Sequence, residues 1–137
     1  MLLTIEKVII LKSINLFSEI SENDLLAIAM QLQEIEYEEN TIVFEQGDLG
    51  TSLYIIVTGE VEVIVNEKVV SVFGEKNIFG ELAALDPEPR SATIKTTKNS
   101  LLFKVDSIIM YNLIAEYSDV ARGIIKILCQ RIRQSTT

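Results

Sequence analysis

The chain has 137 residues, 48% of them hydrophobic, and 12 basic against 20 acidic residues give a formal net charge of −8. That length predicts one domain with a substantial core, and the acidic balance argues against direct binding of nucleic acid. The chain has no histidine and one cysteine, Cys129. These counts exclude histidine-dependent catalytic triads and zinc sites, and also an internal disulfide bond. They favour an intracellular, cytoplasmic protein that is held together by packing.

No segment has the length of a membrane span or the pattern of a secretory signal. The longest uninterrupted apolar run, Leu53 to Val57, has five residues, whereas a helix that crosses a bilayer needs about 20. The first residues, Met1 to Lys7, lack the charged and apolar regions of a signal peptide. We therefore expect no membrane span in this chain.

Helical periodicity predicts helices over roughly residues 4–32. Apolar residues recur loosely from residue 5 to residue 16. Ser21, with Asp24 three residues later, is typical of the start of a helix. The apolar residues that follow are spaced as on one helix face: Leu25, Ile28, Ala29 and Leu32.

From about residue 34 to residue 105 the pattern is typical of strands. Polar and apolar residues alternate over residues 34–38, 60–65 and 91–95. Short β-branched runs lie between them, at residues 41–44, 52–57, 69–73 and 100–105. Turn-forming residues separate the runs, at residues 47–50, 58–60, 66–67 and 86–89. Short strands at this spacing predict an antiparallel sandwich or barrel.

Helical periodicity returns after Asp106, and a second amphipathic segment begins at Ser118 or Asp119. Cys129 lies on that segment, and we interpret it as a small core residue. Residues 120–137 carry four basic residues and no acidic one. We interpret two of them, Arg131 and Arg133, as complementing the C-terminal end of a helix dipole rather than as a patch for nucleic acid. The predicted class is α+β, with a roll between N-terminal and C-terminal helices.

Residues 79–85 interrupt the predicted strands. Leu82 to Leu85 is too short and too rich in alanine for a strand, and it predicts one helical turn entered through Gly80. The start of a helix presents N–H groups and the positive end of the dipole, which suit an anion. Arg90 follows nine residues after Glu81, and a guanidinium binds two phosphate oxygens at once. The segment therefore predicts an anion site.

Structural explanations stand beside the functional ones. Arg90 could be the ion-pair partner of nearby carboxylates, which are Glu81, Asp86 and Glu88. Glu81 could stabilise a helix dipole by roughly 0.3–1 kcal/mol. The alternating glutamates of residues 34–38 and 60–62 could be paired catalytic acids. Residues two apart on a strand share a face, however, and the wetted face of a sheet is the commoner explanation.

The segment FGELAALDPEPRSATI, residues 79–94, resembles the phosphate-binding cassette of cyclic nucleotide-binding domains. This family includes the catabolite activator protein, kinase regulatory subunits and nucleotide-gated channels. Two further motifs match in the expected order: residues 47–56 resemble the family's glycine-containing turn and strand, and residues 57–63 resemble its hairpin with a single glycine. The resemblance covers roughly residues 12–133. Three motifs in register make it specific.

The resemblance implies a ligand and a set of binding residues. Arg90 would pair with the cyclic phosphate, together with backbone N–H groups around Ala83 and Ala84. Glu81 would accept a hydrogen bond from the ribose 2′-OH. The implied set also includes Gly80, Leu82, Ser91, Ala92 and, behind the base, Val63 and Ser71. Because Ser91 lacks the methyl group of the threonine that often accompanies cGMP in this family, we expect cAMP, with cGMP as the second candidate.

The resemblance also implies an antiparallel β-roll, a double-stranded β-helix of the jelly-roll kind, over roughly residues 34–105. A short phosphate-cassette helix would lie inside the roll, and helices would occupy roughly residues 4–32 and 106–134. All would form a single domain of residues 1–137. We expect Arg90 to face a pocket in which Glu81, Asp86 and Glu88 already supply negative charge. Arg90→Glu would therefore leave the stability of the ligand-free chain nearly unchanged.

The implied function is that of a non-catalytic regulatory module, since the sequence has no phosphate-transfer motif. We expect no cofactor, no metal site and no catalytic residue. The signal would pass through the C-terminal helices to an effector that is not in this chain, and the last helix could support a homodimer. Two alternatives remain open. One is a degenerate copy of the fold that serves as an interaction or scaffold domain without nucleotide, and the other, more remote, is an enzyme on a jelly-roll scaffold.

Overall fold

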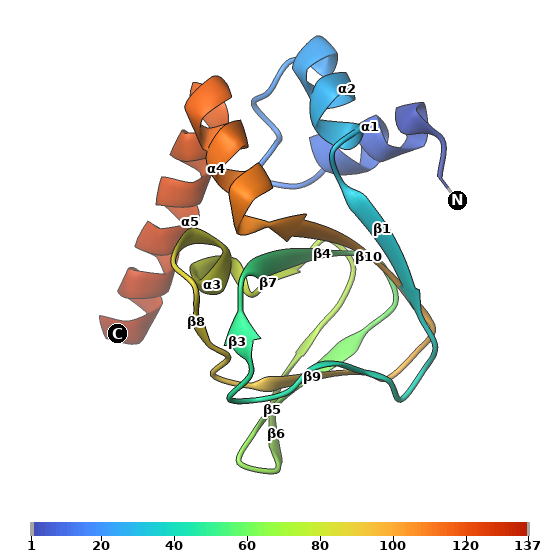
Figure 1. The fold of residues 1–137 in the computed structure, drawn as a ribbon, viewed down its shortest axis with the longest axis vertical. Helices are drawn as coiled ribbons and strands as arrows, with labels where there is room; N and C mark the ends of the chain where they lie inside the picture. Colours follow the sequence, from blue (N-terminus) through green and yellow to red (C-terminus); the bar gives the residue numbers. More distant parts are fainter. Residues whose placement is uncertain (1, 137) are drawn as a thin grey trace. The chain divides into compact units, whose positions relative to one another are not determined.

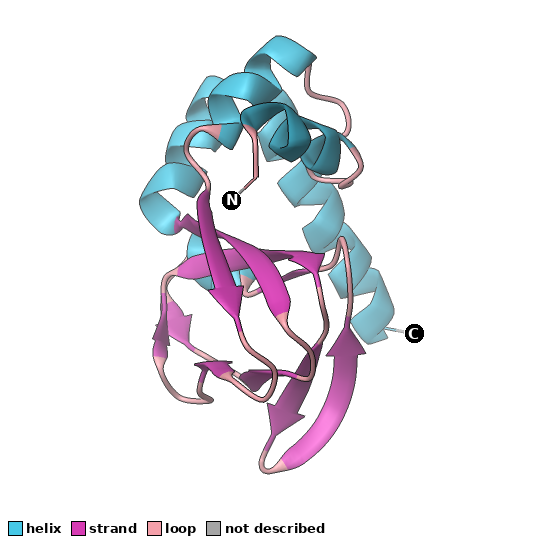
Figure 2. Cartoon of the chain, turned by 90° about the vertical axis from the view of Figure 1, so that its right-hand side faces the viewer, coloured by secondary structure: helices cyan, strands magenta, loops and turns pink. Residues whose placement is uncertain are grey.

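The computed structural model describes residues 2–136 of the chain. These residues form five helices and ten strands, coloured along the sequence in Figure 1 and by secondary structure in Figure 2. The chain divides into two compact units: residues up to Gln31 together with those from Tyr111 onwards, and residues 32–110. The predicted α+β class, with an antiparallel roll preceded and followed by helices, is confirmed.

The helical unit contains helices from both ends of the chain. They are α1 (Thr4–Lys12), α2 (Glu22–Ala29), α5 (Ser118–Thr136) and the last residues of α4 (Ser107–Glu116). The predicted start of α2 is confirmed, because the Ser21 hydroxyl accepts a hydrogen bond from the Asp24 N–H at 3.3 Å. In α5, a Cβ atom added to Gly123 would lie 2.7 Å from the Leu16 carbonyl oxygen. Glycine therefore permits close approach of two backbones here.

Residues 32–110 fold as an antiparallel roll. One sheet has the order β1 (Gln33–Tyr37), β10 (Ser100–Asp106), β4 (Ser52–Thr58), β7 (Ile78–Phe79). The other has the order β2 (Ile42–Phe44), β9 (Thr93–Thr96), β5 (Val61–Val65), β6 (Lys68–Phe73). A third, two-stranded ladder joins β3 (Leu49–Gly50) to β8 (Glu88–Pro89). All the pairings are antiparallel.

The core of the roll follows from the alternation of side chains along the strands. Since successive residues point to opposite faces, one apolar set from each strand faces the interior. The buried members come from both four-stranded sheets and are Tyr54, Ile56, Val61, Phe79, Ile94 and Leu102. Half-buried residues pack against this cluster, among them Phe44, Val63 and Phe73. This core supports the short helix α3 (Glu81–Leu85), which lies between β7 and β8 in the chain (Figure 1).

Two parts of the roll differ from the strands predicted by the sequence pattern. Residues 47–50 and 86–89, which have the composition of turns, contribute the β3–β8 ladder. The strand predicted over residues 91–95 begins at Thr93 instead, so that Ser91 and Ala92 lie outside it. Glycine or proline marks residues 47–50 and 86–89 as turns in the sequence, while their pairing is set by the partner strand.

Candidate functional site

The helix α3 is entered through Gly80, as the sequence predicts. Gly80 is the N-cap residue with φ of +76°, a left-handed conformation that glycine adopts without steric cost. The Ala84 N–H, one of the amides that the resemblance implies for the phosphate, donates instead to the Gly80 carbonyl oxygen at 3.3 Å. The amides of Leu82 and Ala83 precede this first hydrogen bond of the helix. A helix start of this kind presents N–H groups to whatever lies in front of it.

The Arg90 side chain is buried, with 8% of its surface exposed. Its Nη2 donates to the Ser52 carbonyl oxygen at 2.9 Å, and its Nη1 donates to the Gly80 carbonyl oxygen at 3.4 Å. Both acceptors are backbone carbonyls, whereas Asp86 and Glu88, proposed above as ion-pair partners, are exposed. That Arg90 faces a ligand pocket stays a prediction, but its side chain is not open to solvent. The guanidinium is instead held at the start of α3.

Burial lowers the pKa of Arg90 below its usual value, and this effect is opposed by Tyr54 and Asp48. Desolvation disfavours the charged form of a base. The ring of Phe44 lies on one side of the guanidinium, with 4.0 Å between the Arg90 Cζ atom and the ring centroid. An aromatic face attracts a cation at this distance. The contact therefore opposes the cost of burying the charge.

The chain brings Arg90 to this position through the β3–β8 ladder. The Arg90 N–H donates to the Asp48 carbonyl oxygen at 2.6 Å, and the Gly47 N–H donates to the Arg90 carbonyl oxygen at 2.8 Å. A Cβ atom added to Gly50 would lie 2.6 Å from the Arg90 Cζ atom. Two of the motifs found in the sequence thus meet in space, and Gly50 leaves room for the guanidinium.

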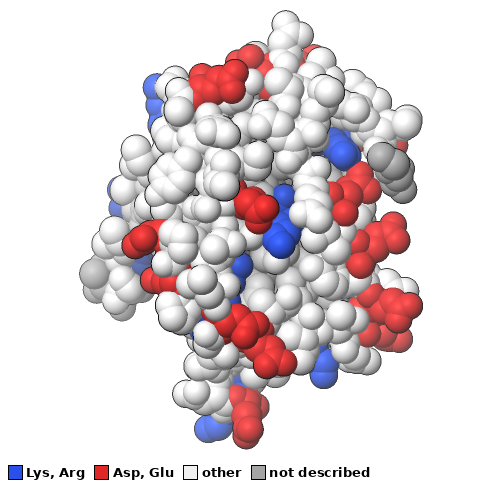
Figure 3. Space-filling model, viewed as in Figure 1, with Lys and Arg blue, Asp and Glu red and all other residues white. Residues whose placement is uncertain are grey.

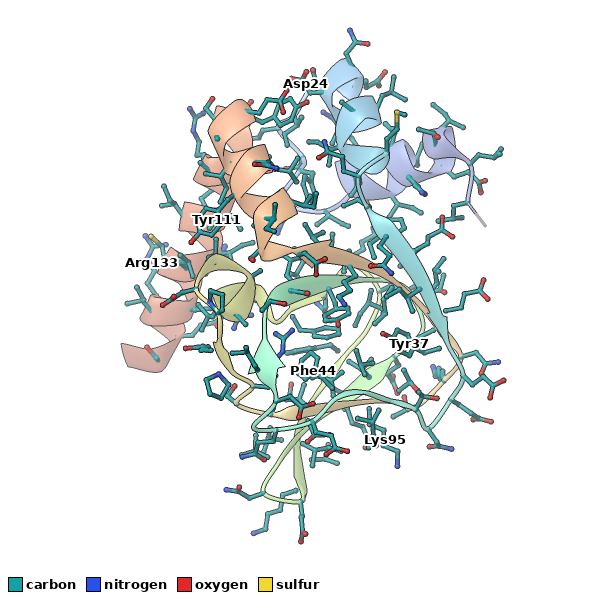
Figure 4. All side chains as sticks on the ribbon, in the orientation of Figure 1. Asp24, Tyr37, Phe44, Lys95, Tyr111 and Arg133 are labelled. Atoms are coloured by element: carbon teal, nitrogen blue, oxygen red, sulfur yellow. The ribbon has the colours of Figure 1, made fainter. Side chains whose placement is uncertain are left out.

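Three aromatic rings from different strands form a cluster, and two of them, Phe44 and Tyr54, lie within 6.0 Å of the Arg90 Cζ atom. Tyr54 and Phe79 are stacked with 5.2 Å between ring centroids, and the Phe44 ring lies 5.8 Å from Tyr54 and 5.9 Å from Phe79. Burial raises the pKa of the Tyr54 phenol to about 12, with further increases from Tyr37 and Asp106. Phe44, labelled in Figure 4, points into the roll. The wall behind Arg90 is therefore aromatic and largely dry.

The other residues of the predicted set lie in different surroundings. On α3, Glu81, Ala83 and Ala84 are buried, whereas Leu82 is 47% exposed. Ser91 is exposed and Ala92 is half-buried.

Val63 and Ser71 are partners in the register of the β5–β6 pair, and both are half-buried. Val63 also pairs with Ile94 of β9 and packs against the core. Their role behind a base stays a prediction.

Three residues that lie against Arg90 are absent from the binding set that the sequence predicts: Phe44, Gly50 and Ser52. Ser52 contributes only its backbone carbonyl. Because any residue would supply this group, the residue type at position 52 does not indicate the contact. Phe44 lies in a short β-branched run in which it has the appearance of an ordinary core residue. Gly50 belongs to the turn motif of residues 47–56. Its position next to Arg90 explains why glycine stands there, since a Cβ atom would overlap the Arg90 side chain.

Acidic side chains are spread over the face of the molecule drawn in Figure 3, with basic side chains between them. Within residues 2–136, none of the helices is both long enough and apolar enough to cross a membrane.

Comparison with known proteins identifies the family. The family model described as the cyclic nucleotide-binding domain matches residues 34–117 of the chain. The chain belongs to the cyclic nucleotide-binding domain family. The match includes α3, the β3–β8 ladder and Arg90, so the structural features described above lie inside the region that defines the family.

Individual relatives agree with this assignment. A CRP-like cAMP-activated global transcriptional regulator of Mycobacterium tuberculosis is 26% identical over 131 residues, which are 92% of this chain and 58% of that protein. A cAMP-dependent protein kinase regulatory subunit of Candida albicans is 32% identical over 106 residues, 77% of this chain and 23% of that protein. The chain thus spans only part of the length of the relatives it matches, and these relatives are regulatory proteins.

Among solved structures, the catabolite activator protein of Thermus thermophilus has the same fold. The TM-score is 0.83 and the identity is 24%, with 89% of this chain and 60% of that chain covered. This likeness supports the assignment of the roll and its flanking helices to one family fold.

Proposed function

We propose that this chain is a non-catalytic regulatory module that binds a cyclic nucleotide, with cAMP favoured over cGMP. The observation that carries the proposal is the buried guanidinium of Arg90, which lies at the start of α3 within hydrogen-bonding distance of the Gly80 carbonyl. A buried cation that contacts the N-cap residue of α3 is suited to a phosphate that carries one negative charge, and the amides of Leu82 and Ala83 in the first turn would bind the same group.

The remaining contacts of the ligand follow the family pattern. Glu81, buried on the first turn of α3, would accept a hydrogen bond from the ribose 2′-OH, which would select ribonucleotides. Val63 and Ser71 would lie behind the base. Ser91 and Ala92 would lie beside the phosphate or the base edge. The names of the two relatives, one cAMP-activated and one cAMP-dependent, support cAMP as the ligand.

The output of the module would pass from the roll through α4 and α5 to an effector. A homodimer formed through α5 belongs to the same proposal. The nucleotide would leave the site chemically unchanged, because the proposed contacts bind the phosphate and the ribose and provide no group that attacks phosphorus.

Calorimetry and thermal unfolding with cAMP, cGMP and 5′-AMP test the proposal. We expect cAMP to raise the melting temperature, since a ligand at 100 times its dissociation constant adds about 2.7 kcal/mol to the stability of the folded state. We expect 5′-AMP, which carries a second negative charge, to bind more weakly. The nucleotide recovered after incubation should still be cyclic by chromatography.

Two results would change the proposal. If cGMP binds tenfold more tightly than cAMP, a difference of about 1.4 kcal/mol, the ligand preference is reversed. If neither cyclic nucleotide binds at millimolar concentration, the chain is a copy of the fold that acts as an interaction or scaffold domain. The exposed carboxylates of Asp86 and Glu88 are the feature that favours this second candidate, because like charge near the site weakens anion binding.

A further inference from the structure

The Arg90 guanidinium has an aromatic neighbour to which the proposed function gives no role. Phe44 lies on β2, 46 positions before Arg90 in the chain, and its ring centroid is 4.0 Å from the Arg90 Cζ atom. Tyr54, the next nearest ring, is 6.0 Å from the same atom. Phe44 thus makes the closer of these two cation–ring contacts.

The position of the guanidinium is fixed from three directions. The Ser52 and Gly80 carbonyl oxygens accept hydrogen bonds from Nη2 and Nη1, and Gly50 lies so close that a Cβ atom there would overlap the side chain. The two bonds use only part of the donor capacity of a guanidinium, which has five N–H groups. The remaining N–H groups can serve an anion without loss of either carbonyl bond.

Burial makes the ring contact important. With 8% of its surface exposed, Arg90 has lost most of its hydration, and a buried charge needs compensation. Carbonyl oxygens compensate in the plane of the guanidinium, whereas only a ring face or another flat group can do so above the plane. An aliphatic side chain at residue 44 would fill the same space without attracting the cation.

We propose that Phe44 is a positioning residue that holds the Arg90 guanidinium in its buried orientation before a cyclic nucleotide arrives. The expected consequence is tighter binding of the nucleotide, and in this respect the inference rests on the proposed function. In the wild-type chain the arginine is ordered before the ligand binds. Without the ring the ligand must order it, at a cost in affinity.

The test compares three variants by calorimetry with cAMP. Phe44→Leu keeps an apolar side chain and removes the aromatic face, whereas Phe44→Tyr keeps the face. Phe73→Leu is the matched control, because Phe73 is also half-buried against the same core cluster and makes no ring contact with Arg90 in the described structure. We expect Phe44→Leu to weaken cAMP binding about five- to tenfold. Phe44→Tyr and Phe73→Leu should remain within about twofold of wild type.

A spectroscopic measurement on the ligand-free chain separates positioning from a general packing role. A proton above an aromatic ring is shifted upfield, so the side-chain resonances of Arg90 should be displaced in the wild type and in Phe73→Leu. In Phe44→Leu they should return towards the values of an ordinary arginine. Phe44→Tyr should preserve the displacement.

The outcomes are distinct. Equal weakening by Phe44→Leu and Phe73→Leu, or unchanged affinity in Phe44→Leu, would overturn the positioning role. Arginine resonances that do not depend on residue 44 would overturn it as well. If the wild-type chain binds no cyclic nucleotide at all, the proposed function fails, and the role in binding fails with it. A wild type that binds while Phe44→Leu behaves identically defeats the positioning role alone.

Discussion

Replacing Arg90 by glutamate would reverse a charge at a site built for a cation. The carboxylate would meet the Ser52 and Gly80 carbonyl oxygens, which now accept hydrogen bonds, and the face of the Phe44 ring, which repels an anion. We expect Arg90→Glu to abolish cAMP binding and to lower the free energy of unfolding of the ligand-free chain by about 1–3 kcal/mol. Calorimetry and urea denaturation measure the two effects.

Two further variants serve as comparisons for Arg90→Glu. Lys98→Glu reverses the charge of an exposed lysine in the same unit, and it should change the stability by less than about 0.5 kcal/mol. Arg90→Lys keeps the charge but loses the planar fork, so it should lose cAMP affinity while it destabilises the chain less than Arg90→Glu. A chain with Arg90→Glu that is as stable as wild type would contradict the role of the two carbonyls.

Gly50 allows a prediction in which binding and stability separate. A Cβ atom at this position would overlap the end of the Arg90 side chain, which can move, whereas Gly→Ala also lowers the entropy of the unfolded chain. We expect Gly50→Ala to change the free energy of unfolding by less than about 1 kcal/mol. The displaced guanidinium should weaken cAMP binding on the order of tenfold. Gly74→Ala, with no atom within 4 Å of the added Cβ, is the control and should bind normally.

At the scale of single elements, β4 contains a buried phenol with a consequence for pH. Burial raises the pKa of Tyr54 from 10.0 to about 12, so the folded state favours the neutral phenol. In the unfolded chain Tyr54 ionises near pH 10, so its contribution to stability is complete below that pH. It is lost as the pH rises towards 12. The predicted loss is about 2–3 kcal/mol.

Urea denaturation between pH 9 and pH 12 measures this effect. Tyr54→Phe should remove most of the decrease in stability above pH 10. A smaller decrease should remain from Tyr37, whose pKa burial also raises. An identical profile for Tyr54→Phe and wild type would mean that the Tyr54 phenol is accessible to water.

Sequence patterns predict best the elements whose own residues have a recognisable composition, spacing or cap. Short β-branched and apolar runs predict β4 and β10, and the Ser21 cap predicts the start of α2. The two-residue strands β3, β7 and β8 have too few residues for any periodicity. Their pairing depends on partners far away in the chain, which a local pattern does not contain.

The same division holds for the candidate site. The cassette motif contains both Gly80 and Arg90, so the sequence predicts that the two belong together. Nothing in a linear pattern indicates that Arg90 is buried, or that its partners are a ring on β2 and a carbonyl at the start of β4. These contacts arise only when strands distant in sequence pack into the roll.

At the scale of the whole molecule, every residue of the predicted ligand-binding set lies within residues 32–110, one of the two compact units. The helical unit contains α5, to which the proposed function assigns the output. The sequence predicts a single domain. If that prediction is correct, a change confined to the helical unit should lower the stability of the roll by the same amount, because a single domain unfolds in one cooperative transition.

Gly123→Ala tests this cooperativity, because the added Cβ atom would lie 2.7 Å from the Leu16 carbonyl oxygen, a backbone atom that cannot move aside cheaply. Overpacking of this kind costs about 1–3 kcal/mol and should lower the melting temperature by roughly 5–10 °C. We expect the helical signal in far-ultraviolet circular dichroism and the resonances of the roll core to be lost at the same lowered temperature. Gly74→Ala, whose added Cβ atom meets nothing within 4 Å, should leave both transitions where they are in wild type. If Gly123→Ala lowers the melting temperature of the helices while the roll core melts as before, the chain consists of two folding units, and the single-domain prediction is wrong.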